Sequence, residues 1–143
     1  MKEMSKARII AKRSIEEVMS ERRLLEQLDH PFLVNMRFAF QEREHLYLVS
    51  DILSGGDLRY HLGLKHTFEE KEAKFIIACL IVGLEAMHSK GILHRDIKPE
   101  NLILEESGYV RLTDLGIAKV LRPNNSSDTS GTPGYMAPEV MCK

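Results

Sequence analysis

The sequence has only two cysteines, no long apolar run and no excess of charge of either sign. Cys79 lies inside an apolar pattern and Cys142 next to the last residue, so neither a disulfide framework nor a metal-ligand spacing is present. The longest apolar run, Phe75 to Leu84, has half of the roughly 20 residues that cross a bilayer. No membrane span and no signal peptide are visible. A reducing, intracellular setting, the cytoplasm, is the expected location.

The charge is balanced along the chain. Twenty Lys and Arg residues against 21 Asp and Glu give a net charge of -1 with His neutral, and the basic residues are spread out. A general attraction to nucleic acid or to an anionic membrane is therefore not expected. The 143 residues, 43% of them hydrophobic and 29% charged, fit one soluble domain with a moderate core. Partners must be inferred from sites, and the oligomeric state stays open.

Two segments show the apolar periodicity of helices. Ser14 to Leu28 and Thr67 to Ser89 are expected to be helical, and the apolar centre of the second places it inside a helical lobe. A shorter helix is expected from Asp57 to Leu64, after a glycine pair that separates two halves of different character. The expected capping boxes are Ser14 with Glu17 and Thr67 with Glu70.

Six segments are expected to be strands, two of which are the short runs Ile92 to Leu93 and Leu102 to Leu104 on either side of a charged loop. Met1 to Ser5 reads as the end of a strand, and Tyr109 to Thr113 alternates as a strand. Phe32 to Gln41 and His45 to Leu53 form an expected hairpin, and the almost wholly apolar second strand should be buried on both faces.

A charged loop is enclosed by short apolar runs between Gly91 and Leu104, GILHRDIKPENLIL. Its composition alone fits a solvated charged turn. The order of its residues, H-R-D-x-K-x-x-N, resembles the catalytic loop of protein kinases and is highly specific. Lys98 followed by Pro99 resembles the serine/threonine kinases. The segments MKEMSKARII, HPFLVN, GGDLRYHL and GTPGYMAPEV are similar to those of the AGC group of these kinases.

The resemblance covers Met1 to Lys143 and implies an α+β fold, a partial form of the bilobal kinase domain. Residues 1–53 would be an incomplete N-lobe with its hinge, and residues 54–143 an incomplete C-lobe through the activation segment. No G-x-G-x-x-G is present, so the small mixed lobe would lack its first strands, and only the first part of the mainly helical lobe follows. We therefore expect these residues alone to be poorly stable and inactive.

The resemblance also implies roles for charged residues. Asp96 would orient the substrate hydroxyl and accept its proton, and Lys98 would approach the transferring phosphate. Asn101 and Asp114, the latter in a D-L-G run where kinases have D-F-G, would bind Mg²⁺. The expected ATP contacts are Lys2, held by Glu21, together with Asp51, Leu53, Asp57 and Leu102.

Two further positions, one of which departs from the family pattern, carry expectations of their own. Leu115 replaces the usual Phe. It is a smaller apolar side chain, expected in an internal column with Leu25, Met36 and His94. Ser50 is a small residue at the gate behind the adenine pocket, which predicts an enlarged pocket.

Asp128 stands where AGC kinases usually carry a phosphorylated threonine. It would supply a built-in negative charge to Arg95. Thr129 is the alternative phosphosite. In the plainer interpretation, Asp128 is only a polar loop residue.

The implied function is Mg-ATP-dependent phosphoryl transfer to a Ser or Thr hydroxyl of a protein substrate. The alternative is a non-catalytic, kinase-like binding or regulatory module, which the missing glycine-rich loop and Leu115 favour. All of the expected catalytic residue types are present, so catalysis is preferred for the parent protein.

Overall fold

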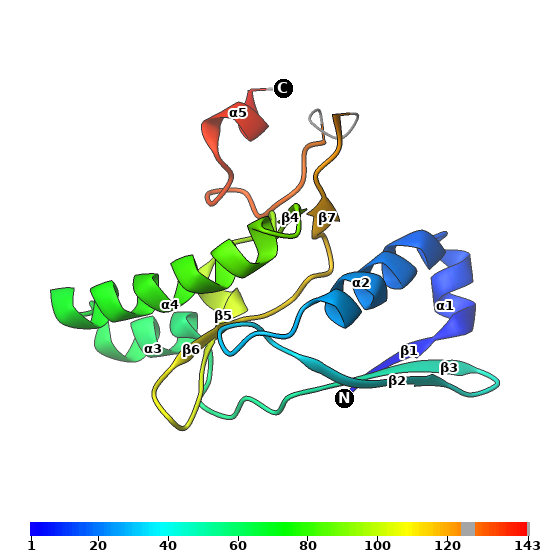
Figure 1. The fold of residues 1–143 in the computed structure, drawn as a ribbon, viewed down its shortest axis with the longest axis horizontal. Coiled ribbons are helices and arrows are strands. Elements are labelled where there is room, and N and C mark those ends of the chain that lie inside the picture. Colours follow the sequence, from blue (N-terminus) through cyan, green and yellow to red (C-terminus); the bar gives the residue numbers. More distant parts are fainter. Residues whose placement is uncertain (124–127, 143) are drawn as a thin grey trace.

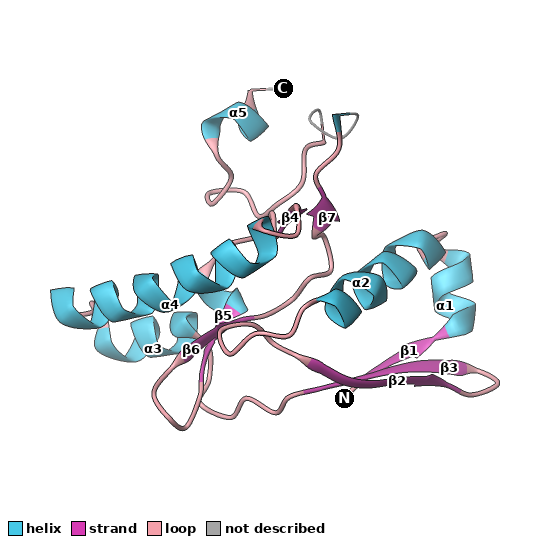
Figure 2. Ribbon diagram, viewed as in Figure 1, coloured by secondary structure: helices cyan, strands magenta, loops and turns pink. Residues whose placement is uncertain are grey.

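A computed structural model of the chain describes residues 1–123 and 128–142. Figure 1 shows two groups of elements joined near the middle of the molecule, and Figure 2 shows that long loops connect them. The elements within residues 1–50 form a sheet lobe, and those within residues 57–142 form a mainly helical lobe. The sheet lobe contains β1 (Lys2–Ser5), α1 (Lys6–Ala11), α2 (Ile15–Gln27), β2 (Met36–Gln41) and β3 (His45–Ser50). The expected α+β class is confirmed.

The sheet of the first lobe is antiparallel, with strand order β1-β3-β2. Lys2 pairs with Leu48 on the central strand, so the first strand lies beside the β2–β3 hairpin that the sequence predicts. Both hairpin strands are shorter than expected. Burial of β3 on both faces is wrong, because Leu48 is its one buried residue among partly exposed neighbours. Figure 1 shows α1 and α2 on the same side of this sheet, which leaves the other side open.

The helix α1 is not expected from the sequence, and it changes how α2 begins. The Ser14 hydroxyl donates a hydrogen bond back to the Ile9 carbonyl of α1 across 3.5 Å, and the Ser14 amide donates to the same oxygen. Ser14 therefore precedes α2 without a side-chain cap, and the capping box with Glu17 is wrong. The reason is the preceding helix, whose last turn offers the Ser14 side chain another acceptor.

The helical lobe is built around one long helix, α4 (Glu70–His88), with α3 (Leu58–Lys65) beside it (Figure 1). Two short antiparallel pairs, β4 with β7 and β5 with β6, hold the loops of this lobe. The remaining elements are β4 (Ile92–Leu93), the 3-10 turn η1 (Pro99–Asn101), β5 (Leu102–Leu104), β6 (Val110–Leu112), β7 (Lys119–Val120) and α5 (Pro138–Met141).

The long helix is capped by a different pair than expected. The Glu69 carboxylate and the Glu72 side chain form the reciprocal capping box, so the Thr67–Glu70 pairing is wrong. Along α4, Cys79, Gly83 and Met87 are buried. The opposite face is exposed in spite of its apolar character, with Ile77 at 49% and Ile81 at 59%. Among the described residues, no helix is both long enough and apolar enough to cross a membrane.

The core runs through both lobes and joins them. Leu33 forms a parallel bridge with Leu112 of β6, and the Val34 amide donates to the Leu112 carbonyl across 2.9 Å. The segment between α2 and β2 is thereby attached to a strand of the helical lobe. On the other side of the junction, the Gly55 amide donates to the Leu104 carbonyl of β5 across 3.1 Å. These links fix where the loops after β4 and β6 lie relative to the sheet lobe.

Candidate active site

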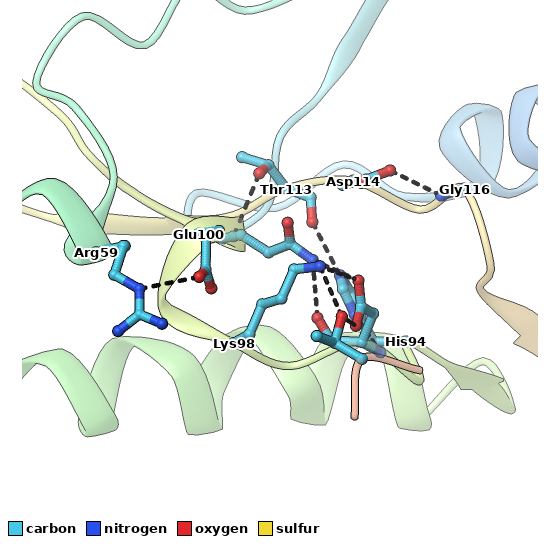
Figure 3. Close-up of polar contacts among 10 residues, drawn as sticks. Arg59, His94, Lys98, Glu100, Thr113, Asp114 and Gly116 are labelled. Carbon is cyan, nitrogen blue, oxygen red and sulfur yellow. Dashed lines mark hydrogen bonds and ion pairs between the residues drawn. The ribbon is translucent and has the colours of Figure 1, made fainter. Parts of the chain in front are cut away.

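The charged loop follows β4 and is folded back by η1, so that three of its side chains converge. Lys98 Nζ lies 2.8 Å from Asp96 Oδ2, and the Asn101 amide nitrogen donates to Asp96 at its carbonyl oxygen (2.8 Å) and at Oδ2 (3.2 Å). Thr132, from the segment before α5, joins them: its hydroxyl donates to Asp96 Oδ1 across 2.6 Å and accepts from Lys98 across 2.8 Å. Figure 3 shows Lys98 of this cluster near His94, with dashed lines for the polar contacts.

These contacts set the charge of the cluster. Burial raises the pKa of the Asp96 carboxyl, but hydrogen bonds from Lys98 and Thr132 outweigh it and hold that pKa below its ordinary value. The hydrogen bond to Asp96 in turn raises the pKa of the Lys98 ammonium. At neutral pH the loop therefore presents a carboxylate and an ammonium group, both fixed in direction. A carboxylate with a hydroxyl at 2.6 Å has the geometry that an attacking alcohol requires.

His94 supports the loop from within. It is 2% exposed, its Nε2–H donates to the Thr113 carbonyl across 2.9 Å, and its Nδ1 accepts from the Asp96 amide across 3.2 Å (Figure 3). An Nδ1 that accepts a hydrogen bond carries no proton, so the imidazole is neutral. Burial also lowers the pKa of His94. His94 is thus a structural residue that supports the loop.

Asp114 follows β6, and its position is set by a rare backbone conformation. Its φ of 62° lies in the left-handed region, and its Oδ1 accepts from the Gly116 amide across 3.1 Å. The Thr113 amide donates to the Asn101 carbonyl across 2.8 Å, which brings the ends of β5 and β6 together. Asp114 and Asn101 therefore lie on adjoining segments, with carboxylate and amide oxygens of the kind that bind Mg²⁺.

A cavity of about 550 Å³ lies between the two lobes. At its wall, Lys2 Nζ contacts both carboxylate oxygens of Glu21, at 2.7 and 2.8 Å. The predicted ion pair between β1 and α2 is therefore present in the structure. Residues from both lobes line the cavity, among them Lys2, Glu21, Leu25, Met36, Ser50, Asp51, Leu53, Ile103, Asp114 and Leu115.

Two residues expected at the nucleotide lie outside the lining of this cavity. Leu102 is 6% exposed, pairs with Leu112 in the core, and is not among the lining residues, whereas Ile103 is. Neighbouring residues of a strand face opposite sides of the sheet. The residue of β5 that faces the cavity is therefore Ile103, one position further along than expected. Asp57 also lies outside the lining, and its carboxylate accepts from the Tyr60 amide across 2.8 Å as the cap of α3.

The apolar residues expected as an internal column are all at least partly buried. Leu25 and Leu115 belong to the core, and Met36 packs against it. His94 lies buried beside Asp96. Leu115 is 3% exposed, so the smaller side chain in place of Phe is fully covered.

The comparisons with known proteins agree with this arrangement. Residues 1–143 match the protein kinase domain family, and the chain belongs to that family. The RAC family serine/threonine-protein kinase homolog of Dictyostelium discoideum is 40% identical over 144 residues, 99% of this chain and 32% of that protein. Human serine/threonine-protein kinase 32B is 43% identical over 141 residues, 98% of this chain and 34% of that protein.

Serine/threonine-protein kinase Sgk1 of Xenopus tropicalis is 42% identical over 146 residues, 100% of this chain and 35% of that protein. The resemblance to serine/threonine kinases, AGC members among them, is confirmed. The chain spans about a third of the length of the curated relatives it matches.

Proposed function

We propose that the protein containing this chain is a serine/threonine protein kinase that transfers a phosphoryl group from Mg-ATP to a hydroxyl of a protein substrate. The observation that carries this proposal is the Asp96 carboxylate, which holds a hydroxyl at 2.6 Å and an ammonium group at 2.8 Å. An acceptor for the proton and a cation for the phosphoryl oxygens thus lie side by side.

Asp96 would orient the substrate hydroxyl and take its proton, and Thr132 occupies the place of that hydroxyl in the present contacts. Lys98 would offset negative charge on the transferred group. Asn101 and Asp114 would hold Mg²⁺ through hard oxygen ligands, and the ion would neutralise charge that develops on the phosphates. All four residues are held by hydrogen bonds or an ion pair to neighbouring groups, so little reorganisation is needed.

The nucleotide would occupy the cavity between the lobes. Lys2, which Glu21 holds in position, would contact the phosphates, and Asp51, Leu53 and Ile103 would enclose the adenine. Asp57, whose Oδ1 caps α3, would contact the ribose or a basic residue of the substrate through its other carboxylate oxygen. Residues 1–53 would act as the N-lobe with hinge and residues 54–143 as the C-lobe, in an intracellular, cytoplasmic protein.

The test uses the complete protein that contains these residues. Asp96→Asn keeps the shape of the side chain and removes its basicity, so phosphoryl transfer should fall on the order of 10²–10⁴-fold while Mg-ATP binding persists. Asp29→Asn is the matched control, since Asp29 is exposed beyond the end of α2. A wild-type protein that binds Mg-ATP and transfers nothing would instead be a non-catalytic binding or regulatory module.

A further inference from the structure

The carboxylate of Asp51 joins the two lobes behind the cavity. Asp51 follows β3, where the chain leaves the sheet lobe. Its Oδ1 accepts from Arg37 Nε of β2 across 2.5 Å, and its Oδ2 accepts from Arg111 Nη1 of β6 across 2.8 Å. One side chain is thus bound by a cation from each lobe, and each oxygen has its own partner.

The network is shielded from water on its helical-lobe side. The side chains of Asp51 and Arg111 are 13% and 16% exposed, while that of Arg37 is 57% exposed. Glu105 completes the group by accepting from Arg111 Nη2 across 2.5 Å. Two carboxylates and two guanidinium groups give no net charge. Because partly buried pairs are screened less than surface pairs, the Asp51–Arg111 contact holds its geometry better than an exposed one.

Backbone contacts connect this network to both ends of the cavity. The Asp51 amide donates to the Asn35 carbonyl across 3.0 Å, and Asn35 follows the segment that bridges to β6. Arg111 is in β6, three residues before Asp114. Asp51 and Asp114 both line the cavity. The ion pair between Asp51 and Arg111 therefore connects one lining residue to the strand that directly precedes the other.

We propose that Asp51 is a positioning residue, which uses its ion pairs with Arg37 and Arg111 to hold the hinge segment (residues 51–56) in the geometry that the nucleotide requires. This inference rests on the proposed function. Contacts at the adenine end are made equally in the ground state and the transition state, so loosening them raises the KM for ATP and leaves kcat little changed.

The test compares Arg111→Gln, Arg111→Lys and Asp51→Asn in the complete protein. Arg111→Gln and Asp51→Asn should each raise the KM for ATP about fivefold, which is about 1 kcal/mol at 1.4 kcal/mol per tenfold, and their combination should be less than additive. Arg111→Lys, which keeps the charge, should restore most of the affinity. Arg43→Gln is the matched control, since its guanidinium is 95% exposed in the β2–β3 turn. A KM in Arg111→Gln within twofold of the control, or a lower one, overturns the proposal.

Two further readouts separate this inference from the proposed function. Calorimetric Kd values for Mg-ADP should follow the same order as the KM values even if no phosphoryl transfer occurs. Amide exchange of residues 49–55 without nucleotide should be faster in Arg111→Gln than in Arg43→Gln, because the hinge opens more often. Equal exchange in the two variants overturns the positioning role whether or not the protein is a kinase.

Discussion

Arg95 contacts Asp128 across 3.2 Å, from the residue directly before Asp96 to a carboxylate 33 positions later in the chain. Lys119 of β7 binds the same oxygen of Asp128 at 2.5 Å. The hydrogen bond from Lys119 and the charge of Arg95 hold the pKa of Asp128 below its ordinary value. At neutral pH the loop that carries Asp96 is therefore tied to a negative charge on Asp128, the contact that the built-in-charge interpretation of the sequence requires.

The built-in charge predicts that activity does not depend on phosphorylation of this segment. Asp128→Ala in the complete protein should lower phosphoryl transfer on the order of tenfold, because Arg95 loses its anionic partner. Thr129→Ala should leave the rate unchanged, since Thr129 is exposed beside it. Steady-state rates on one peptide substrate give the comparison. Unchanged activity in Asp128→Ala with loss of activity in Thr129→Ala would contradict the idea and assign the regulation to Thr129.

The Lys2–Glu21 ion pair predicts that substitutions of its two residues raise the KM for ATP to different extents. Lys2→Met should raise the KM for ATP on the order of tenfold or more, because the phosphates lose a cation. Glu21→Gln should do less, because the amide oxygen still accepts a hydrogen bond from Lys2. The double variant should be close to Lys2→Met alone, since Glu21 acts through Lys2.

Lys6→Met is the control for this pair, because the Lys6 ammonium binds the exposed Glu42 carbonyl away from the cavity. Additive effects of the Lys2 and Glu21 substitutions on the KM for ATP would show that the two residues act independently.

The resemblance carried by the order of residues in the charged loop implies that Asp96, Lys98 and Asn101 belong to one site, and the structure brings these three side chains into contact. Local patterns fail where the helix begins at a different residue than the pattern favours. Thr67 with Glu70 and Glu69 with Glu72 have the same spacing, but α4 begins at Glu70, so the second pair forms the capping box. Which side of β5 faces the cavity is likewise set by its pairing with β6, which the local pattern does not contain. For this reason Leu102 is expected from the sequence at the position where the structure has Ile103.

Long-range charge pairs are the other limit of sequence interpretation. The sequence places Asp51 in the segment at the adenine pocket, but nothing in its neighbourhood predicts Arg111, 60 positions away. β3 ends at Ser50 rather than at Leu53, and the side chain of Asp51, the next residue, binds Arg37 and Arg111. Thr132 is predicted as part of the activation segment, whereas its contacts with Asp96 and Lys98 are visible only in the folded chain.

The neutral His94 predicts a pH dependence of stability. In the unfolded chain His94 takes up a proton as the pH falls through about 6.5, while burial keeps it neutral in the folded protein to lower pH. The unfolded state then binds more protons, so the free energy of unfolding should fall by up to about 1.4 kcal/mol per pH unit below about 6.5. Denaturant unfolding of the complete protein between about pH 7.5 and 5.5 measures this slope.

His94→Phe removes the titrating group and should flatten that slope, whatever it does to stability at neutral pH. His88→Phe, at an exposed position of α4, should keep the wild-type slope. Equal slopes in wild type and His94→Phe would mean that other groups account for the pH dependence.

The exposed apolar face of α4 predicts how the 143 residues behave by themselves. Ile77 and Ile81 are 49% and 59% exposed, and Met141 of α5 is 64% exposed. Surfaces of this kind favour association, so the isolated piece should bind a hydrophobic dye, aggregate on heating and transfer no phosphate. Ile81→Glu should make the piece more soluble but destabilise the complete protein, if further residues cover this face there. A cooperative thermal transition together with measurable phosphoryl transfer by the piece would contradict the prediction.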